Sequence, residues 1–385
     1  MKAIVIGAGM GGMSAAVALK QAGIDCQVFE AVKENKPVGA AISVWSNGVK
    51  CMNHLGMGAI MEQLGGPMQQ MAYQDYQSGG VLTQFSLKPL VDSVHERPCP
   101  VSRADLQAAM IQFWGEENIS FGKRVTHVEQ NASGVSVFFE DGSQADADFL
   151  IAADGSHSIV RPYVLGFQPE RRYAGYVNWN GLVTIDESIA PANQWTTFVG
   201  EGKRVSVMPI ADNRFYFFFD VPLPKGLDED RSSAKADLQG YFKGWCEPVQ
   251  KLIEQLDYST INRIEVHDIE PFEQIVQDRI ALLGDAGHCT TPDIGQGGCA
   301  AMEDAVVLGQ VFSEPDISIE AALATYQAQR VARVRDLVLK ARKRCDMTHG
   351  KEMPRTEAWY AELKGETGEN IMAGLRETII GGPLG

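Results

Sequence analysis

The sequence predicts an α/β protein in which an antiparallel sheet is inserted into a β-α-β-based domain and the C-terminus is helical. Three observations support this prediction. The chain begins with an apolar strand, a glycine-rich loop, a helix and a second strand, which together make one β-α-β unit. Residues 168–270 contain strand-like segments separated by turn residues, as in an antiparallel sheet. After the segment RIALLGD, helix-forming sequence dominates to the end of the chain.

The opening β-α-β unit can be followed along the chain. Residues 2–6, KAIVI, form an apolar run typical of a buried strand. Residues 13–23, MSAAVALKQAG, have the composition of a helix that ends at a glycine. The next strand, DCQVFE, ends in Glu30. Further along, VSRADLQAAMIQFW predicts a helix, and GVSVFFEDGSQADADFLIAAD predicts two strands joined by a turn at EDG.

The inserted sheet is predicted in two pieces. Residues 72–97 contain short strands, with a hairpin around Gly79–Gly80. Residues 168–270 contain the strands YVNWNGLVTI, WTTFVG, KRVSVMPI and RFYFFFDV, with a helix near 233–254. The expected boundaries are 1–71, 98–167 and 271–317 for the first domain, 72–97 and 168–270 for the sheet domain, and 318–385 for the C-terminal helices.

Composition and charge exclude several kinds of partner. The chain has 385 residues, of which 45% are hydrophobic and 22% charged, and a net charge of −15. Nucleic acid is therefore not expected as a partner, since phosphate binding depends on clustered Lys and Arg. No apolar run approaches the roughly 18 residues that span a bilayer, so no membrane association is expected. The seven cysteines form no C-x-x-C pair, and we expect reduced thiols in a cytoplasmic protein.

The loop GAGMGG matches the dinucleotide-binding pattern G-x-G-x-x-G at Gly7, Gly9 and Gly12. The same loop contains Gly11. Its position between a strand and a helix, with Glu30 ending the next strand, makes the pattern specific. Gly7 permits the tight turn, Gly9 lets a pyrophosphate approach, and Gly12 allows close helix–strand packing. Glu30 would accept hydrogen bonds from a ribose and repel a 2′-phosphate, which favours FAD or NAD over NADP in a Rossmann-like domain.

Two further motifs follow strands later in the chain. Residues 154–161 read DGSHSIVR after FLIAA, and residues 284–288 read GDAGH after RIALL. Together with the N-terminal glycine motif, the patterns DGxxSxxR and GD resemble those of the single-component FAD-dependent aromatic hydroxylases, the para-hydroxybenzoate hydroxylase type. The resemblance covers almost the whole chain, and three motifs in this order are specific for that family.

The resemblance implies roles for the residues that match the family's motifs. Arg103 in VSRADL would reach the phosphate region of FAD, and Asp154 would serve FAD and the reducing pyridine nucleotide. Asp285 would accept hydrogen bonds from flavin-side hydroxyls, and the PDIGQGG loop would present a helix N-terminus to the isoalloxazine ring. The expected cofactor-binding residues are Gly7, Gly9, Gly11, Gly12, Glu30, Arg103, Asp154, Asp285, Gly295, Gly297 and Gly298.

The resemblance also implies the reaction. The chain has no second dinucleotide-binding fingerprint, so NADH is expected to bind transiently and reduce the bound FAD, with NADPH left open as reductant. The reduced flavin would react with O2 to a C4a-hydroperoxide, which transfers oxygen to an electron-rich substrate in a dry, orienting pocket. The expected enzyme is therefore an FAD-dependent NAD(P)H monooxygenase.

The inserted sheet carries candidate substrate-binding residues. Alternation places Arg204 on one face of KRVSVMPI, and Tyr216 and Asp220 together on one face of RFYFFFDV. Arg204 is either a surface residue beside Lys203 or a clamp for a planar anion, since its guanidinium offers N–H donors in a rigid fork. Tyr216 is either a substrate contact or a core aromatic residue.

Asp293 lies in TPDIGQG, next to the expected reactive edge of the flavin. It is either a turn or N-cap residue or an acceptor for substrate N–H groups, and it would repel a benzoate-type anion. A purine such as urate has both N–H donors and anionic acceptors, so it would suit Asp293 and Arg204 together. The sequence also resembles the family members that hydroxylate urate to 5-hydroxyisourate, including TPDIGQGG and KRVSVMPI. Arg204, Asp293 and Tyr216 are therefore the expected catalytic residues.

Other functions remain open from the sequence. They are hydroxylation of a benzoate-type phenol such as salicylate, a flavin reductase or dehydrogenase that does not use O2, and a non-catalytic FAD-binding protein. We expect a structural role for His288, and we expect Cys289 and Cys299 to be small buried residues without a catalytic partner. No His or Cys cluster has metal-ligand spacing, so no metal is expected.

Overall fold

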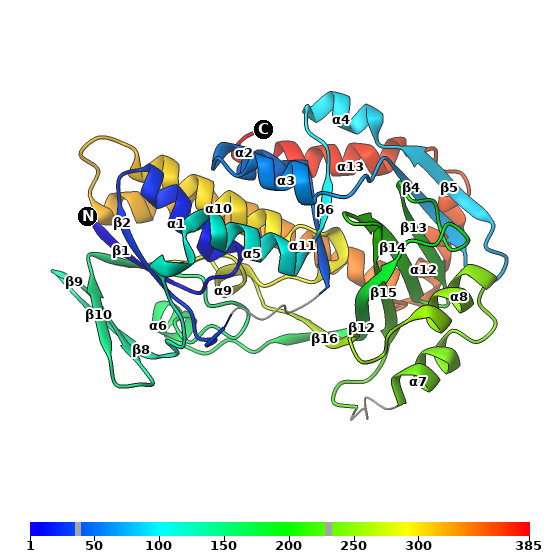
Figure 1. Ribbon diagram of the computed structural model, residues 1–385, viewed down its shortest axis with the longest axis horizontal. Helices are drawn as coiled ribbons and strands as arrows, with labels where there is room; N and C mark the ends of the chain where they lie inside the picture. The colour runs from blue at the N-terminus through cyan, green and yellow to red at the C-terminus, as the bar shows by residue number, and fades with distance from the viewer. Residues whose placement is uncertain (35–39, 228–232) are drawn as a thin grey trace.

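The computed structural model describes residues 1–34, 40–227 and 233–385, and its first large sheet contains the N-terminal strand (Figure 1). The strands of this sheet are β1 (Lys2–Ile6), β2 (Asp25–Phe29), β7 (Ile119–Ser120), β11 (Phe149–Ala152), β17 (Val276–Gln277) and β18 (Ile280–Leu282). Their order is β17-β18-β11-β1-β2-β7. All neighbouring pairs are parallel except β17 with β18 at one edge.

The glycine-rich loop leads into a helix that is buried on most sides. α1 (Met10–Gln21) begins at Met10 and not at the expected Met13, because Gly9 is itself the N-cap residue. The small side chains of α1 let it pack closely against α10 (Gly297–Phe312), and α5 (Arg103–Trp114) also contacts α1. This packing fixes the start of α1 at the carboxyl end of β1.

Two small sheets accompany the six-stranded sheet. One consists of β8 (Val125–Asn131), β9 (Gly134–Phe139) and β10 (Gln144–Ala147), and the other of β3 (Ala41–Val44) and β6 (Cys99–Ser102). The EDG turn joins β9 to β10 as expected, but the expected second strand is divided at Asp148, whose Oδ2 accepts a hydrogen bond from Lys2 N at 2.7 Å. β10 and β11 therefore belong to different sheets. The β3–β6 pair is absent from the sequence prediction.

Short helices connect these sheets. They are α2 (Ser46–His54), α3 (Gly58–Leu64), α4 (Lys88–Val94), α6 (Arg161–Leu165) and α9 (Asp285–His288). α4 lies in the segment 72–97, where only strands were expected, and this part of the prediction is wrong. Pro89 in its first turn and a left-handed C-cap at His95 set its limits.

The second large sheet is the inserted one. Its strands are β4 (Gln70–Asp75), β5 (Val81–Ser86), β12 (Arg172–Thr184), β13 (Gln194–Gly200), β14 (Lys203–Ile210), β15 (Arg214–Pro222) and β16 (Asn262–Asp268). Their order is β16-β12-β15-β14-β13-β4-β5. The expected β4–β5 hairpin around Gly79–Gly80 is confirmed. The sheet is antiparallel as expected, except that β4 and β13 are parallel.

The two faces of the inserted sheet differ in chemistry. Val205, Val207, Phe217 and Phe219 point to one face and form a core with α7 (Ala234–Tyr241) and α8 (Glu247–Gln255). The helix expected near 233–254 is thus two helices. Arg204, on the opposite face, pairs in register with Asp220 of β15. This second face is directed toward the six-stranded sheet and its helices, because its Met208 and Tyr216 pack with the hydrophobic core that surrounds that sheet.

The C-terminal helices tie the two large sheets together. They are α11 (Ile319–Thr348), α12 (Met353–Leu363) and α13 (Glu369–Ile380). α11 runs from α10 toward the inserted sheet (Figure 1), and its Cys345 packs against Tyr176 of β12. Among the helices of the described ranges, none combines the length and the apolar composition needed to cross a membrane.

Candidate active site

Four predicted motifs meet at the carboxyl edge of the parallel sheet. Gly7 follows β1, Glu30 follows β2, Asp154 follows β11, and Asp285 follows β18. These strands are neighbours in the order β18-β11-β1-β2. Ligands of open α/β sheets bind at this edge, so motifs that are far apart in sequence can contact one ligand.

The glycine loop contains two kinds of glycine. At Gly7 (φ +99°) a Cβ would lie 2.3 Å from Ala153 O, and at Gly12 it would lie 1.8 Å from Gly7 O. These two positions admit only glycine, because a Cβ would collide with the neighbouring backbone. A Cβ at Gly9 would meet nothing within 4 Å. Gly9 therefore leaves open space over the N-terminus of α1, which suits a bound pyrophosphate.

Glu30 is held in place at the end of β2. Its Oε2 accepts a hydrogen bond from Ala8 N at 2.8 Å, and its Oε1 accepts one from Val32 N at 3.0 Å. A carboxylate has about four acceptor positions, so Glu30 retains acceptors for ribose hydroxyls.

The DG motif forms a compact turn around a buried arginine. Asp154 Oδ2 accepts from Ile159 N at 2.8 Å, whereas its Oδ1 is buried without a partner among the described residues. Burial raises the pKa of Asp154. Arg161 is fully buried and donates to Ala286 O at 2.6 Å and to Asp285 O at 2.8 Å. The DG and GD motifs are thus joined through the Arg161 guanidinium.

The GD motif and the following loop present free polar groups. The side chain of Asp285 is exposed between buried neighbours and accepts no hydrogen bond from any residue that the structure describes. At Gly295 (φ +63°) a Cβ would lie 2.5 Å from Ser43 Oγ and 2.8 Å from Trp45 Nε1. No side chain caps α10, so Gly297 and Gly298 open its first turn with free backbone N–H groups.

These features fit FAD. Gly9 leaves room for the pyrophosphate, and Glu30 and Asp285 offer carboxylates to hydroxyl groups. The uncapped start of α10 would place N–H groups and a positive helix end near a reduced, anionic ring. Arg103, the first residue of α5, is exposed and available to a phosphate.

A buried cluster of charges lies on the inner face of the inserted sheet. Arg204 Nε donates to Asp220 Oδ2, and an Arg204 terminal nitrogen donates to Asp293 Oδ1 at 3.1 Å. The Arg204 side chain is 10% exposed, and both carboxylates are fully buried. The alternative of a surface arginine is therefore wrong. The remaining N–H donors of Arg204 have no hydrogen-bond partner in the part of the chain that the structure describes.

Asp293 lies in a short 3-10 turn, Pro292–Ile294, and receives hydrogen bonds only from side chains among the described residues. Tyr176 OH donates to Oδ2 at 3.0 Å, and His349 Nε2 lies 3.1 Å from Oδ1. The alternative of a turn or N-cap residue that binds backbone amides is wrong. Burial would raise the pKa of Asp293, but Arg204 and His349 hold it well below its usual value. Sequence reasoning missed Tyr176 and His349.

Tyr216 lies beside this cluster. It is the register partner of Met208, and its ring centroid is 5.6 Å from that of Phe218. Its hydroxyl makes no hydrogen bond with a described residue, although burial raises the pKa of the phenol. A neutral, unpaired hydroxyl beside Arg204 can contact a substrate.

Other reactive side chains near the loop have structural surroundings. His288 is buried, with Nε2 2.6 Å from Asp304 Oδ2, in agreement with the expected structural role. Cys289 and Cys299 are buried, and burial raises the pKa of each thiol to about 12, so both are protonated. Neither is an activated nucleophile.

Within the described ranges, Asp293, Cys345 and His349 bring three possible metal-ligand atoms within 4.8 Å of one another. Arg204 is hydrogen-bonded to the same Asp293 oxygen, and a second cation there would be repelled. Burial also raises the pKa of the Cys345 thiol, so it is a poor ligand. We assign no metal to this group.

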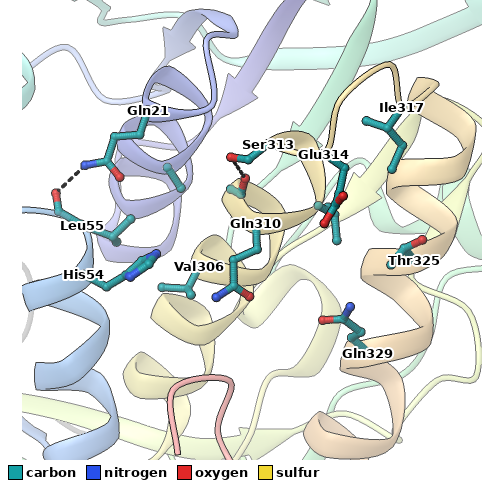
Figure 2. A pocket seen from close by; sticks show the side chains of 13 residues that line it. Gln21, His54, Leu55, Val306, Gln310, Ser313, Glu314, Ile317, Thr325 and Gln329 are labelled. Carbon is teal, nitrogen blue, oxygen red and sulfur yellow. Dashed lines mark hydrogen bonds between the residues drawn. The ribbon is translucent and has the colours of Figure 1, made fainter.

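A cavity of about 710 Å³ lies elsewhere, between α1, α2, α10 and α11 (Figure 2). Part of its polar wall is already bonded within the protein. Gln21 Nε2 donates to Leu55 O at 3.0 Å, and Ser313 Oγ donates to Gly309 O at 2.7 Å. None of the candidate site residues named above lines it, so it is separate from the candidate site.

Known proteins resemble this chain over its whole length. Residues 1–341 match the family model described as an FAD binding domain. The chain is 70% identical to an FAD-dependent urate hydroxylase from Klebsiella pneumoniae over 100% of both chains. It is 52% identical to an FAD-dependent urate hydroxylase from Mycolicibacterium vanbaalenii, covering 100% of this chain and 98% of the other.

Solved structures agree with these relatives. Klebsiella pneumoniae HpxO complexed with FAD and uric acid matches with a TM-score of 0.98 at 68% identity, covering 100% of this chain and 98% of that chain. A salicylate hydroxylase substrate complex matches with a TM-score of 0.80 at 22% identity, covering 100% and 99%, which shows the fold alone. The expected α/β fold with an inserted sheet and a helical C-terminus is confirmed. The chain belongs to the FAD-binding-domain family and is a full-length relative of the FAD-dependent urate hydroxylases.

Proposed function

We propose that this protein is an FAD-dependent monooxygenase that uses NADH and O2 to hydroxylate urate to 5-hydroxyisourate. The observation that carries this proposal is the buried Arg204, whose free N–H donors lie on the polar face of the inserted sheet. The 70% identity to a urate hydroxylase supports the same substrate. Seven free cysteines, six of them buried, favour a reducing compartment such as the cytoplasm.

We propose that the first domain, with the expected boundaries 1–71, 98–167 and 271–317, binds FAD. Gly9 would line the pyrophosphate, Gly7, Gly11 and Gly12 would allow the close packing that shapes the loop around it, and Glu30 would bind the ribose. Bound FAD supplies the redox chemistry by taking two electrons from NADH and passing them to O2. The further contacts would come from Arg103, Asp154, Asp285, Gly295, Gly297 and Gly298.

The sheet domain would bind the substrate. Arg204 can donate its free N–H groups to the oxygens or deprotonated nitrogens of urate, as a rigid fork. Asp293 holds that guanidinium, and because three donors already occupy it, at most about one acceptor position remains for a substrate N–H. The free hydroxyl of Tyr216 would add a third contact. Burial of this charge cluster strengthens each of these interactions.

A spectral titration of the FAD-bound protein with urate tests the function. Urate is expected to perturb the flavin spectrum, accelerate NADH oxidation, and disappear with matching O2 consumption. Salicylate serves as the comparison because it carries an anion without ring N–H donors. Turnover of salicylate but not urate would favour the phenol hydroxylase. NADH oxidation without any O2 uptake, given an added electron acceptor, would favour a reductase.

The variant Gly9→Ala separates FAD binding from folding. A Cβ at this position meets no atom of the described residues within 4 Å, and the backbone there (φ −72°) is accessible to alanine. The melting temperature of the apoprotein is expected to stay the same or rise slightly. The affinity for FAD is expected to fall by roughly tenfold or more, because the methyl group blocks the approach of the pyrophosphate. Unchanged FAD affinity in calorimetry would remove Gly9 from the site.

The variant Asp293→Ala is expected to oxidise NADH in the presence of urate but to hydroxylate little of it. Without Asp293 the Arg204 guanidinium keeps Asp220 as its one carboxylate partner among the described residues, so the substrate is no longer held in one orientation. Hydrogen peroxide formed per NADH is the measurement. Asp92→Ala removes an exposed ion pair and is the control. Wild-type coupling in Asp293→Ala would contradict the role.

The variant Arg204→Gln has a precedent for FAD retention. The R204Q variant of Klebsiella pneumoniae HpxO forms a complex with FAD, and its structure matches with a TM-score of 0.98 over 100% of both chains. This supports placing Arg204 at the substrate, away from the contacts that hold FAD.

A further inference from the structure

We propose that His349 is a positioning residue for the hydroxylation. Its Nε2–H holds the Asp293 carboxylate, which in turn orients Arg204 toward the substrate. The proposal rests on the proposed function, because that function assigns Asp293 and Arg204 to the substrate. His349 comes from the end of α11, directly after Thr348, and no motif points to it.

The hydrogen bond between His349 and Asp293 has one possible direction. His349 Nε2 lies 3.1 Å from Asp293 Oδ1, and the two side chains are 3% and 0% exposed. Asp293 is hydrogen-bonded to Arg204, whose positive charge favours the ionised carboxylate, so Asp293 can only accept. The hydrogen therefore lies on Nε2 of His349.

The ring of His349 also fixes a second donor to the same carboxylate. It stacks on Tyr176 with ring centroids 3.8 Å apart and an interplanar angle of 20°. Tyr176 OH donates to Asp293 Oδ2 at 3.0 Å. The stacked pair thus binds both oxygens of Asp293, one from each ring, and prevents rotation of the carboxylate. Arg204 then receives a carboxylate of fixed orientation.

The other ring nitrogen argues against a purely structural histidine. His349 Nδ1 is buried and has no hydrogen-bond partner among the described residues. A buried polar atom without a partner costs free energy, and a phenyl ring at this position would fill the same space without that cost. The hydrogen bond to Asp293 is the feature that a phenyl ring could not provide.

The position of His349 is itself rigid. Its backbone N–H donates to Cys345 O at 3.0 Å, which completes the last turn of α11. The next residue, Gly350 (φ +68°), lies against the loop between β13 and β14, with its Cα 3.3 Å from the position of a Cβ on Gly202. A histidine anchored in this way can hold Asp293 without moving when substrate binds.

Three substitutions separate the hydrogen bond from the packing. His349→Gln keeps an amide N–H at about the reach of Nε2 but removes the aromatic ring. His349→Phe keeps a ring that can stack on Tyr176 but removes the donor. His349→Asn also carries an amide, but one that is too short to reach Asp293. The FAD content and the melting temperature of each holoenzyme report folding.

The coupling of NADH oxidation to urate hydroxylation is the decisive measurement. His349→Phe and His349→Asn are expected to lower hydroxylation by between about 10- and 100-fold and to form peroxide instead, as for a displaced catalytic group. His349→Gln is expected to retain most of the coupling. The affinity for urate, measured by calorimetry, should likewise fall more in His349→Phe and His349→Asn than in His349→Gln. In an Asp293→Ala background, His349→Phe should have no further effect.

The outcomes distinguish this proposal from the proposed function. If the wild-type protein hydroxylates urate and the Phe and Asn variants remain coupled, the role of His349 is overturned. A loss of coupling in all three variants that follows the fall in their melting temperatures would also overturn the proposal. It would indicate a packing role for His349. If His349→Phe does not fold, the comparison of Gln with Asn decides. If the wild-type protein does not hydroxylate urate, the proposed function fails, and with it the role of His349 in that reaction.

Discussion

Replacement of Arg204 with glutamine is expected to lower the rate of urate hydroxylation per bound FAD by roughly 30-fold or more, while the FAD content stays the same. Loss of one member of a buried, hydrogen-bonded charge pair typically costs about 2–5 kcal/mol. Here the loss also leaves Asp220 and Asp293 buried without their shared cation. The measurements are product formation, peroxide per NADH, and the flavin absorbance of the purified variant.

Two further variants test the cause of this loss. Arg204→Lys keeps the positive charge but not the planar fork, so it should retain FAD and stability better than activity. Arg124→Gln removes an exposed arginine that is 3.8 Å from Glu140, and it should behave as the wild type. If Arg204→Gln hydroxylated urate at the wild-type rate, Arg204 would be no more than a structural partner of the two aspartates.

The sheet residues of the candidate site could be predicted because a strand has a period of two. Arg204, Tyr216 and Asp220 were expected on defined faces of two strands, and the register Arg204↔Asp220 brings them together. The motifs around Gly7, Asp154 and Asp285 were predictable for another reason: each follows a buried strand, and parallel strands end at one edge. Local pattern was sufficient in both cases.

The partners of Asp293 could not be predicted in this way. Tyr176 lies 117 positions from Asp293, and His349 lies 56 positions from it. Tyr176 is one aromatic residue in an aromatic-rich strand, and His349 follows a long helix that has no cap signal pointing to a site. Only the packing of α11 against the inserted sheet brings them together. The candidate site therefore depends on tertiary contacts that carry no periodic signal.

The missed helix α4 has a different explanation. The segment KPLVDSV lies between strands, and its position favoured a strand. Pro89 in the first turn and the Lys88–Asp92 pair at 2.7 Å are both local helix signals. These signals were present in the sequence. The missed β3–β6 pair, by contrast, joins two four-residue strands that are distant along the chain, for which no local signal exists.

Replacement of Arg330 with methionine is expected to lower the free energy of unfolding by about 3–5 kcal/mol. Arg330 Nε donates to Asp304 Oδ1 at 2.6 Å, and a terminal nitrogen donates to Glu303 Oε2 at 3.0 Å. The three side chains are at most 2% exposed. Methionine keeps a long apolar side chain, so the decrease in the free energy of unfolding reports mainly the loss of the positive charge. Urea denaturation of the FAD-bound protein is the measurement.

An exposed ion pair provides the control for this variant. Arg335 Nη1 lies 3.4 Å from Glu273 Oε1, with side chains 41% and 79% exposed. Arg335→Met should change the free energy of unfolding by no more than about 0.5 kcal/mol. Asp304 also accepts a hydrogen bond from Gly284 N at 3.0 Å, so Arg330→Met should weaken FAD binding through the GD motif. Equal effects of the two substitutions would contradict a stabilising role for the buried cluster.

The pH dependence of the Arg330 variant separates charge from packing. Burial alone would raise the pKa of Asp304, but the charges of His288 and Arg330 lower it from 3.8 to about 2. A carboxyl group with a lower pKa in the folded protein stabilises the fold above its unfolded pKa and loses this contribution as the pH falls through the folded pKa. The wild-type protein should therefore lose this contribution between about pH 4 and pH 2. In Arg330→Met the pKa of Asp304 should be higher than in the wild type. The difference in the free energy of unfolding between the two proteins should therefore shrink toward low pH. If the difference in the free energy of unfolding did not depend on pH, the packing of the arginine stem, and not its charge, would hold α11 against α10.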